Sequence, residues 1–277
     1  MPQPQPAADL ERFAADFDSE NPFAFRESLL FCAYVGSQAH GTWIPPEEEM
    51  GTDDIDLMAV VLPPPRSVIG LREWEHWCPK KGDWDYVAYA FPKYFRLLLK
   101  ANPNVLALLW ERDEEVLYCH PLFARLREQR ELFSSRRAAA TITGYAQSQI
   151  AGLHKMKKAG YMGERRAELR ERFGYDVKMA SHALRLLQMG CEFLETGQLR
   201  IYRTDDAWIY KEVKQGKWPL ERVEQRATEL LADLERRTAT SPLPEHPDLE
   251  ACERLLVGTV LDFWREKGWL EAATPGA

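Results

Sequence analysis

The sequence predicts an α+β fold in which a small mixed β-sheet precedes a mainly helical part. Two short apolar runs, residues 29–35 and 57–62, have the length and composition of buried strands. From about residue 134 onward, apolar residues recur at helical spacing instead. We therefore expect a flexible, proline-rich leader over residues 1–20, a sheet-containing domain over residues 21–133, and a helical domain over residues 134–277 that closes a cleft.

The expected elements of the first domain alternate between strand and helix. Three consecutive prolines, residues 63–65, end the second strand because proline has no N–H for the ladder. A third strand is expected over residues 83–89, where apolar, aromatic and polar residues alternate. Helices are expected over residues 71–77, 92–100 and 104–110.

The second domain is expected to consist of long helices. Four are predicted, over residues 138–158 with a break near Gly144, 175–194 with Gly197 ending it, 220–238 and 248–267. A proline-rich linker, residues 241–247, separates the last two.

Composition restricts the class of protein. The chain has 277 residues, 45% of them hydrophobic, and a net charge of −7. No apolar run approaches the roughly 20 residues that span a bilayer, so no membrane partner is expected. Residues 1–6 do not resemble a signal peptide, and five scattered cysteines lack CxxC spacing. These features favour a reducing, cytoplasmic location, and the acidic balance requires any nucleic-acid contact to be local.

Two motifs flank the turn between the first two strands. Gly36-Ser37 leaves the first strand, and Asp54 and Asp56 open the second. Residues two apart on a strand project to the same side, so the two carboxylates face one way. Two such anions suit a divalent cation, and Mg²⁺ prefers carboxylate oxygens together with substrate phosphates. A glycine turn admits phosphate closely, so the pair of motifs predicts metal-dependent chemistry on a nucleoside triphosphate.

A third carboxylate is expected, because two-metal phosphoryl transfer places ions on both the leaving and the attacking oxygens. We favour Asp85, at the head of the third strand, over Asp83, which could be a turn residue after Gly82. The three glutamates before the motif, Glu47, Glu48 and Glu49, are interpreted as part of a solvated loop. Asp53 lies beside the pair.

A polar, cationic stripe is predicted on the helix expected over residues 175–194. Tyr175, Lys178, His182 and Arg185 recur at helical spacing. The stripe could be solvated, but His182 between two cations favours an anion nearby, so we expect the last three residues to face the triphosphate. His40 is left open between reaching a phosphate and packing in its turn.

The most basic stretch of this acidic chain is residues 154–172. It could form a track for an RNA backbone, or an amphipathic helix with internal ion pairs. The residues expected to contact RNA are Lys155, Lys157, Lys158, Arg165 and Arg166.

Four segments together resemble a known family. They are GSQAHGT (36–42), TDDIDL (52–57), DYVAYAFPKYFRLLLKANPNVLALLW (85–110) and GYDVKMASHALRLLQMGCEFLETGQL (174–199). They are similar to the DNA polymerase β-like nucleotidyltransferase superfamily, and within it to the predicted nucleotidyltransferases of the RNA-repair-pathway polymerase-β-like family. The resemblance implies that Asp54 and Asp56 are metal ligands, that Asp85 is the third catalytic acid, and that Gly36 and Ser37 hold the triphosphate. One departure is Ala107, where the resemblance leads us to expect an acid.

The predicted function is therefore transfer of a nucleoside monophosphate from an NTP, with ATP expected, to a hydroxyl acceptor, for which RNA is a candidate. Mg²⁺ or Mn²⁺ is the expected cofactor, held by Asp54, Asp56 and Asp85. The expected nucleotide-binding residues are Gly36, Ser37, His40, Lys178, His182 and Arg185. The alternative is a catalytically silent NTP-binding sensor, or an antitoxin-like module, on the same fold.

Overall fold

The computed structural model describes residues 5–270 except 46–47, 49, 52–53 and 154–163. Its centre is a six-stranded mixed sheet with strand order β3-β5-β2-β1-β6, in which β4 also pairs with β5. The strands are β1 (Leu29–Tyr34), β2 (Ile55–Val61), β3 (His76–Trp77), β4 (Lys80–Lys81), β5 (Trp84–Ala90) and β6 (Val116–Cys119). Only β2 and β5 run parallel; the other pairs are antiparallel. The predicted α+β class is confirmed.

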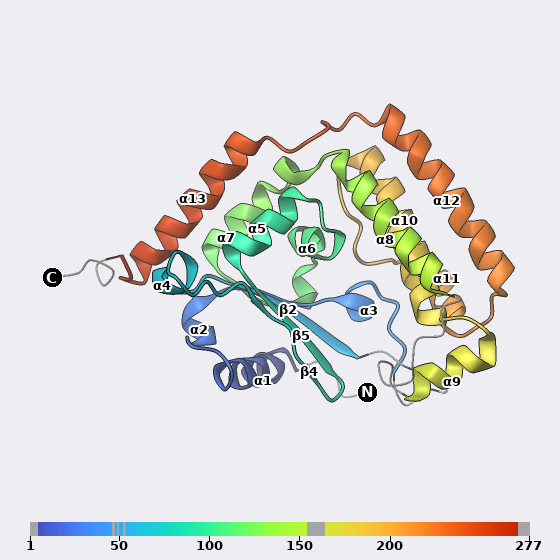
Figure 1. Ribbon diagram of the computed structural model, residues 1–277, viewed down its shortest axis with the longest axis horizontal. Coiled ribbons are helices and arrows are strands. Elements are labelled where there is room, and N and C mark those ends of the chain that lie inside the picture. The colour runs from blue at the N-terminus through green and yellow to red at the C-terminus, as the bar shows by residue number, and fades with distance from the viewer. Residues whose placement is uncertain (1–4, 46–47, 49, 52–53, 154–163, 271–277) are drawn as a thin grey trace.

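The strands form where the sequence offers continuous apolar runs. All six residues of β1 are buried, and they are divided between the two faces of the sheet. Ala33 and Val60 pack into the main core, while Tyr34 and Val61 pack into a second cluster on the other face. Both faces of the sheet are therefore covered, as Figure 1 shows, with most helices on one side and α1 on the other.

The flexible leader expected over residues 1–20 is wrong for its larger part. Pro6–Asp18 forms helix α1, and Phe13 and Phe17 within it are completely buried. The Phe13 ring stacks on Tyr86 of β5 with 4.7 Å between centroids. The proline and glutamine residues at the terminus favoured a flexible leader, although apolar residues recur at helical spacing after them. The sheet covers this apolar stripe.

The helix expected over residues 71–77 is also wrong. The segment is extended and ends in β3, while a short helix α4 (Pro65–Val68) precedes it. Trp74 and Trp77 insert their rings against Phe17 of α1, at 5.7 and 5.3 Å between centroids. Packing of two large aromatic side chains outweighs local helix propensity here.

The remaining helices of the first half surround the sheet. They are α2 (Phe25–Ser28), α3 (Gly36–Ala39), α5 (Phe91–Leu99), α6 (Pro103–Ala107) and α7 (Pro121–Glu128), with short 3₁₀ turns at Leu108–Trp110, Asp113–Glu115 and Arg130–Phe133. The helices predicted over residues 92–100 and 104–110 are thus confirmed, with Asn102 capping α6 through its side chain.

The second half is helical, as predicted. Its helices are α8 (Arg137–Gly152), α9 (Glu164–Phe173), α10 (Val177–Thr196), α11 (Ala207–Lys214), α12 (Leu220–Thr240) and α13 (Leu249–Glu266). Helix α10 lies between α8 and α12, and Gly190 allows Ile142 and Leu234 to approach it closely. Gly144 does not break α8, whereas Gly197 ends α10 in a left-handed conformation, as expected.

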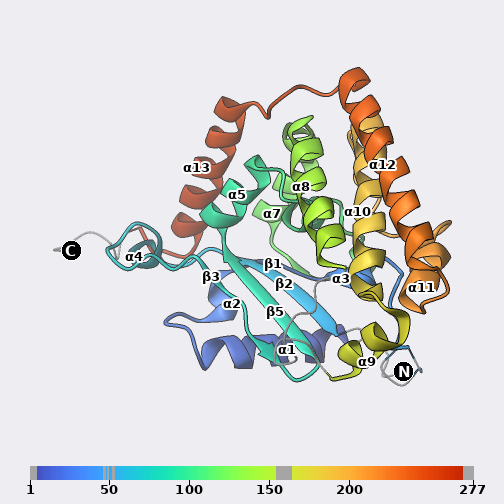
Figure 2. The same ribbon diagram turned by 45° about the vertical axis from the view of Figure 1, so that its right-hand side comes forward.

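One hydrophobic core joins the two halves, because side chains of the sheet and of α8, α10 and α12 belong to a single cluster. Helix α13 returns to the first half, where the Trp264 indole N–H donates to the Pro63 carbonyl at 3.0 Å. Helix α13 contacts α7, and Figure 2 shows it away from α12. Among the helices that the structure describes, none is both long enough and apolar enough to cross a membrane.

Candidate active site

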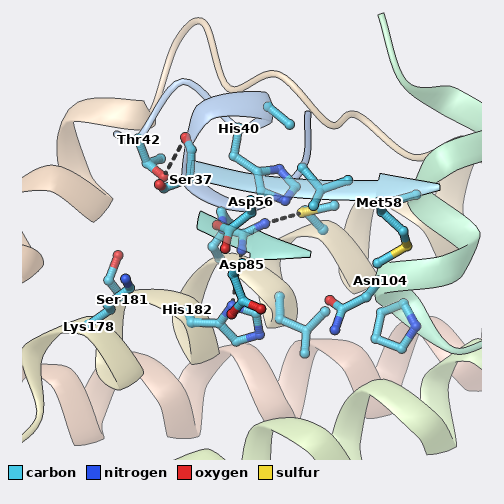
Figure 3. A pocket seen from close by; sticks show the side chains of 18 of the residues that line it. Ser37, His40, Thr42, Asp56, Met58, Asp85, Asn104, Lys178, Ser181 and His182 are labelled. Atoms are coloured by element: carbon cyan, nitrogen blue, oxygen red, sulfur yellow. Dashed lines mark hydrogen bonds between the residues drawn. The ribbon is translucent and has the colours of Figure 1, made fainter. Parts of the chain in front are cut away.

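A cavity of about 270 Å³ lies between the acidic ends of β2 and β5, helix α3 and helix α10. Figure 3 shows Asp56 and Asp85 between His40, which caps α3, and His182 of α10. The cavity brings together most of the residues predicted from the sequence, and these are Gly36, Ser37, His40, Asp56, Asp85, Lys178, His182 and Arg185. Asp54 does not line it.

Strand pairing places the two carboxylates side by side. Asp56 is the second residue of β2 and Asp85 the second residue of β5, and the parallel register pairs them directly. Neighbouring strands lie about 4.8 Å apart, so both side chains leave the sheet at the same point. The competing Asp83 is exposed in the turn before β5, where its carbonyl accepts from the Ile55 N–H.

The glycine turn is built around Asp56. Gly36 has a φ of +65°, and a Cβ at this position would lie 2.1 Å from Oδ2 of Asp56. The Val35 N–H also donates to the Asp56 carbonyl at 2.9 Å. Only glycine therefore fits, and the Gly-Ser turn and the acidic motif form one structural unit.

Ser37 follows with its side chain on the cavity wall. The residue is 9% exposed, and its Oγ has no hydrogen-bond partner within the part of the chain that the structure describes. A buried hydroxyl without a partner is costly, and a ligand oxygen in the cavity would satisfy it.

Nearby charges of both signs act on the pKa of Asp85, the third predicted acid. Burial raises the pKa of Asp85, and Asp54 adds to this shift, while Lys80 and Lys178 oppose it. Asp54 itself forms an ion pair with Lys80 at 2.6 Å. Among the described residues, no three His, Cys, Asp or Glu side chains are close enough together to hold a metal ion. Asp56 and Asp85 remain as a pair, and two carboxylates plus substrate phosphates are a set that suits Mg²⁺.

His40 packs in its turn and also faces the cavity. Its Nδ1 lies 2.8 Å from the Ile201 carbonyl, so the Nδ1–H donates and Nε2 is left as an acceptor. Burial, and then the nearby charge of Arg185, hold the pKa of His40 well below its usual value. A neutral His40 with its donor already used would not hold a phosphate.

The polar stripe of α10 lies along the cavity. Lys178 acts on the pKa of Asp85, and Arg185 acts on that of His40, so the stripe spans the cavity from the acids to α3. Burial, and then Arg185, lower the pKa of His182 to about 3. Its Nδ1 accepts from Arg185 at 3.1 Å, which leaves the proton of the neutral ring on Nε2.

Tyr175 does not belong to this stripe, contrary to the prediction. It lies before α10 begins and is 1% exposed, and its hydroxyl donates to the Trp218 carbonyl at 2.7 Å. Asp176, which caps the helix by accepting from the Met179 N–H, sets the helix start after Tyr175.

Sequence reasoning missed two charged residues of the cavity. Lys214, at the end of α11, is 7% exposed, and its Nζ donates to the Thr42 carbonyl at 3.0 Å. Glu111, after the first 3₁₀ turn, is 2% exposed. Ala107, where an acid was expected, also lines the cavity, so Glu111 supplies a carboxyl four residues later. Spacing could have suggested Glu111, but no local signal marks Lys214.

The described residues include only part of the basic stretch, residues 154–172. Lys155, Lys157 and Lys158 lie outside the described residues, and no side chain is described for Arg165. The Arg166 guanidinium pairs with Asp176, a buried carboxylate, at 2.8 Å. A neighbouring hollow of about 430 Å³ is lined by Arg166 and Tyr145 and shares Lys178, His182 and Asn104 with the cavity. The loop acids Glu47, Glu49 and Asp53 are also outside the described residues, and Glu48 is exposed.

One comparison with known proteins agrees with the motifs. A family model described as RNA repair pathway DNA polymerase beta family matches residues 4–258. A nucleotidyltransferase-like protein from Exiguobacterium sibiricum 255-15, known from a crystal structure, is similar at 16% identity and a TM-score of 0.29, over 95% of this chain and 90% of that chain. A TM-score that low supports no argument. No curated protein matches the chain significantly. The family match confirms the resemblance in the motifs: the chain belongs to the RNA repair pathway DNA polymerase beta family.

Proposed function

We propose that this protein is a nucleotidyltransferase that uses Mg²⁺ or Mn²⁺ to transfer a nucleoside monophosphate from an NTP to a hydroxyl acceptor. One observation carries the proposal. The Asp56 carboxylate packs on Gly36 of the turn, lies in register with Asp85, and faces a cationic helix across a cavity. This arrangement offers anions for a divalent cation beside cations and hydroxyls for phosphates.

The acids would hold the metal. Asp56 and Asp85 present their carboxylates to the cavity, and Asp54 would join them once its ion pair with Lys80 opens. When bound, the metal would neutralise charge on the phosphates and lower the pKa of the acceptor hydroxyl. Burial raises the pKa of Asp85, and a bound cation would oppose this shift by favouring the ionised carboxylate.

The groups around the acids would hold the triphosphate. Ser37 Oγ and the Nε2–H of His182 can donate to phosphate oxygens, and Lys178, Arg185 and Lys214 provide positive charge around them. These groups are fixed by α3, α10 and α11 before a ligand arrives, so they need little reorganisation during the reaction. ATP is the expected nucleotide, although none of these contacts distinguishes one base from another.

RNA is the proposed acceptor. The description of the family names an RNA repair pathway, and the second hollow adjoins the cavity at Lys178 and His182. Tyr145 and Asn104 in this hollow could stack against and hydrogen-bond a terminal nucleotide. A hydroxyl entering from this side would meet Asp85, on whose pKa Lys178 acts directly.

Pyrophosphate release tests the proposal against the silent-sensor alternative. Each NTP is offered with Mg²⁺ and a mixture of RNA acceptors, to the wild type and to Asp56→Asn and Asp83→Asn. We expect release by the wild type and by Asp83→Asn, the exposed control, and a loss of roughly 100-fold or more in Asp56→Asn. Nucleotide binding without pyrophosphate release under any condition would favour the sensor.

A further inference from the structure

Glu111 has an environment that no structural role explains. Its side chain is 98% removed from solvent, it lines the cavity, and Oε1 has no hydrogen-bond partner among the described residues. An unsatisfied buried carboxyl oxygen costs free energy, so the position of Oε1 at a cavity indicates a ligand group.

The neighbouring arginines lower the pKa of Glu111, and the Arg112 backbone N–H donates to its carboxyl, but the ion pairs of both guanidinium groups are with other acids. Arg112 forms its ion pair with Glu115 at 3.0 Å and stacks on the Tyr202 ring. Arg127 pairs with Asp113 at 3.3 Å, and its contact with Glu111 is to the backbone carbonyl. Both guanidinium groups thus form ion pairs with other acids, although each is close enough to lower the pKa of Glu111.

Glu111 and helix α3 line the same cavity. Gln38 of this helix lies 3.5 Å from Glu115, which places α3 against the segment that carries Glu111. Ser37 Oγ, the other polar atom of the cavity wall that is buried without a partner, belongs to the same helix. Two unsatisfied groups therefore line the cavity in which the proposed function places the triphosphate.

We propose that Glu111 is a nucleotide-binding residue whose carboxyl O–H donates a hydrogen bond to a phosphate oxygen of the bound triphosphate. The inference rests on the proposed function, because it assumes that an NTP occupies this cavity. An ionised carboxylate would repel phosphate, so the contact requires the acid to keep its proton.

The surroundings of Glu111 favour that protonated form. Burial, followed by the negative charge of Glu115, raises its pKa to about 8, against the lowering effects of Arg112 and Arg127. Arg185 of α10, Lys214 of α11 and neutral His40, which caps α3, line the same cavity. The other charged or titratable residues of its lining are Asp56, Asp85, Lys178 and His182. A phosphate placed near Glu111 would raise its pKa further, so binding above pH 8 takes up a proton.

Calorimetry with a non-hydrolysable ATP analogue and Mg²⁺ between about pH 6 and about pH 9.5 tests the proposal through this linkage. In the wild type the affinity should fall by tenfold or more over this range, as Glu111 ionises in the free protein. Glu111→Gln keeps a donor that does not titrate, so its affinity should match the wild type at low pH and exceed it at high pH. Glu111→Ala should bind roughly tenfold to a hundredfold more weakly at pH 7.

Two further measurements make the outcome decisive. Titration in buffers of different ionisation enthalpy should show proton uptake by the wild type above pH 8 that is absent in Glu111→Gln. Glu114→Gln, the same change at an exposed site three residues away, should behave as the wild type. Identical pH profiles for Glu111→Gln and the wild type would overturn the proposal. If the wild type binds no nucleotide at any pH, the proposed function itself fails and Glu111 loses its role with it.

Discussion

Replacing Gly36 by alanine tests whether the glycine turn and Asp56 act as one unit. An L-residue at a φ of +65° costs about 1–2 kcal/mol of folding stability. The new Cβ would also lie 2.1 Å from Asp56 Oδ2, whereas ordinary contacts begin at 3.4 Å. The carboxylate must therefore retreat by about 1.3 Å, the difference between these two distances.

A displacement of this size in a catalytic group lowers turnover by roughly 100-fold. The free energy of unfolding of Gly36→Ala should accordingly be lower by about 1–2 kcal/mol, so that it unfolds at a lower urea concentration. It should release pyrophosphate about 100-fold more slowly. The assays are urea denaturation followed by circular dichroism, and the pyrophosphate assay at saturating nucleotide.

Gly268→Ala is the matched control. Its φ is +68°, and a Cβ there meets nothing within 4 Å. It should lose similar stability while keeping full turnover. Wild-type turnover in Gly36→Ala, or an equal loss of turnover in Gly268→Ala, would refute the idea that the Cβ displaces Asp56.

Three further predictions follow from charged residues. Because the pKa of Glu111 is about 8 when folded and 4.5 ordinarily, the folded protein holds this proton longer, and stability declines as pH rises between these values. Glu111→Gln should abolish that decline and be the more stable protein at pH 8, by at most about 5 kcal/mol in thermal or urea unfolding; an unchanged pH profile would contradict it. Lys80→Ala removes the cation paired with Asp54, so Mn²⁺ should bind up to about fivefold more tightly by calorimetry, whereas Lys81→Ala, paired with Asp16, should not change it. If RNA is the acceptor, its binding should weaken with salt at a log–log slope of about −0.7 per neutralised phosphate, and replacing Lys155, Lys157 and Lys158 by glutamate should flatten that slope; salt-independent binding would exclude this track.

Local sequence patterns predict the elements that depend on local forces. The continuous apolar runs of β1 and β2 leave no alternative to buried strands, and Gly197 ends α10 because only glycine adopts its conformation without strain. The register that brings Asp56 beside Asp85 follows from two strands that each begin one residue before an acid.

Other features depend on residues far apart in the chain. Helix α1 forms because the sheet covers Phe13 and Phe17, and β3 is extended because Trp77 reaches α1. Lys214 enters the cavity through a contact with Thr42, which is 172 residues away. No pattern near Lys214 marks that contact, since it depends on how α11 packs against α10.

Electron paramagnetic resonance of Mn²⁺ tests the central claim most directly. The ion is titrated into the wild type, Asp56→Asn, Asp85→Asn and Asp83→Asn, each with and without a non-hydrolysable ATP analogue. We predict that the nucleotide strengthens Mn²⁺ binding in the wild type and in Asp83→Asn, and that Asp56→Asn and Asp85→Asn lose this effect. Nucleotide-dependent Mn²⁺ binding of wild-type strength in Asp56→Asn would contradict the assignment of this cavity as the active site.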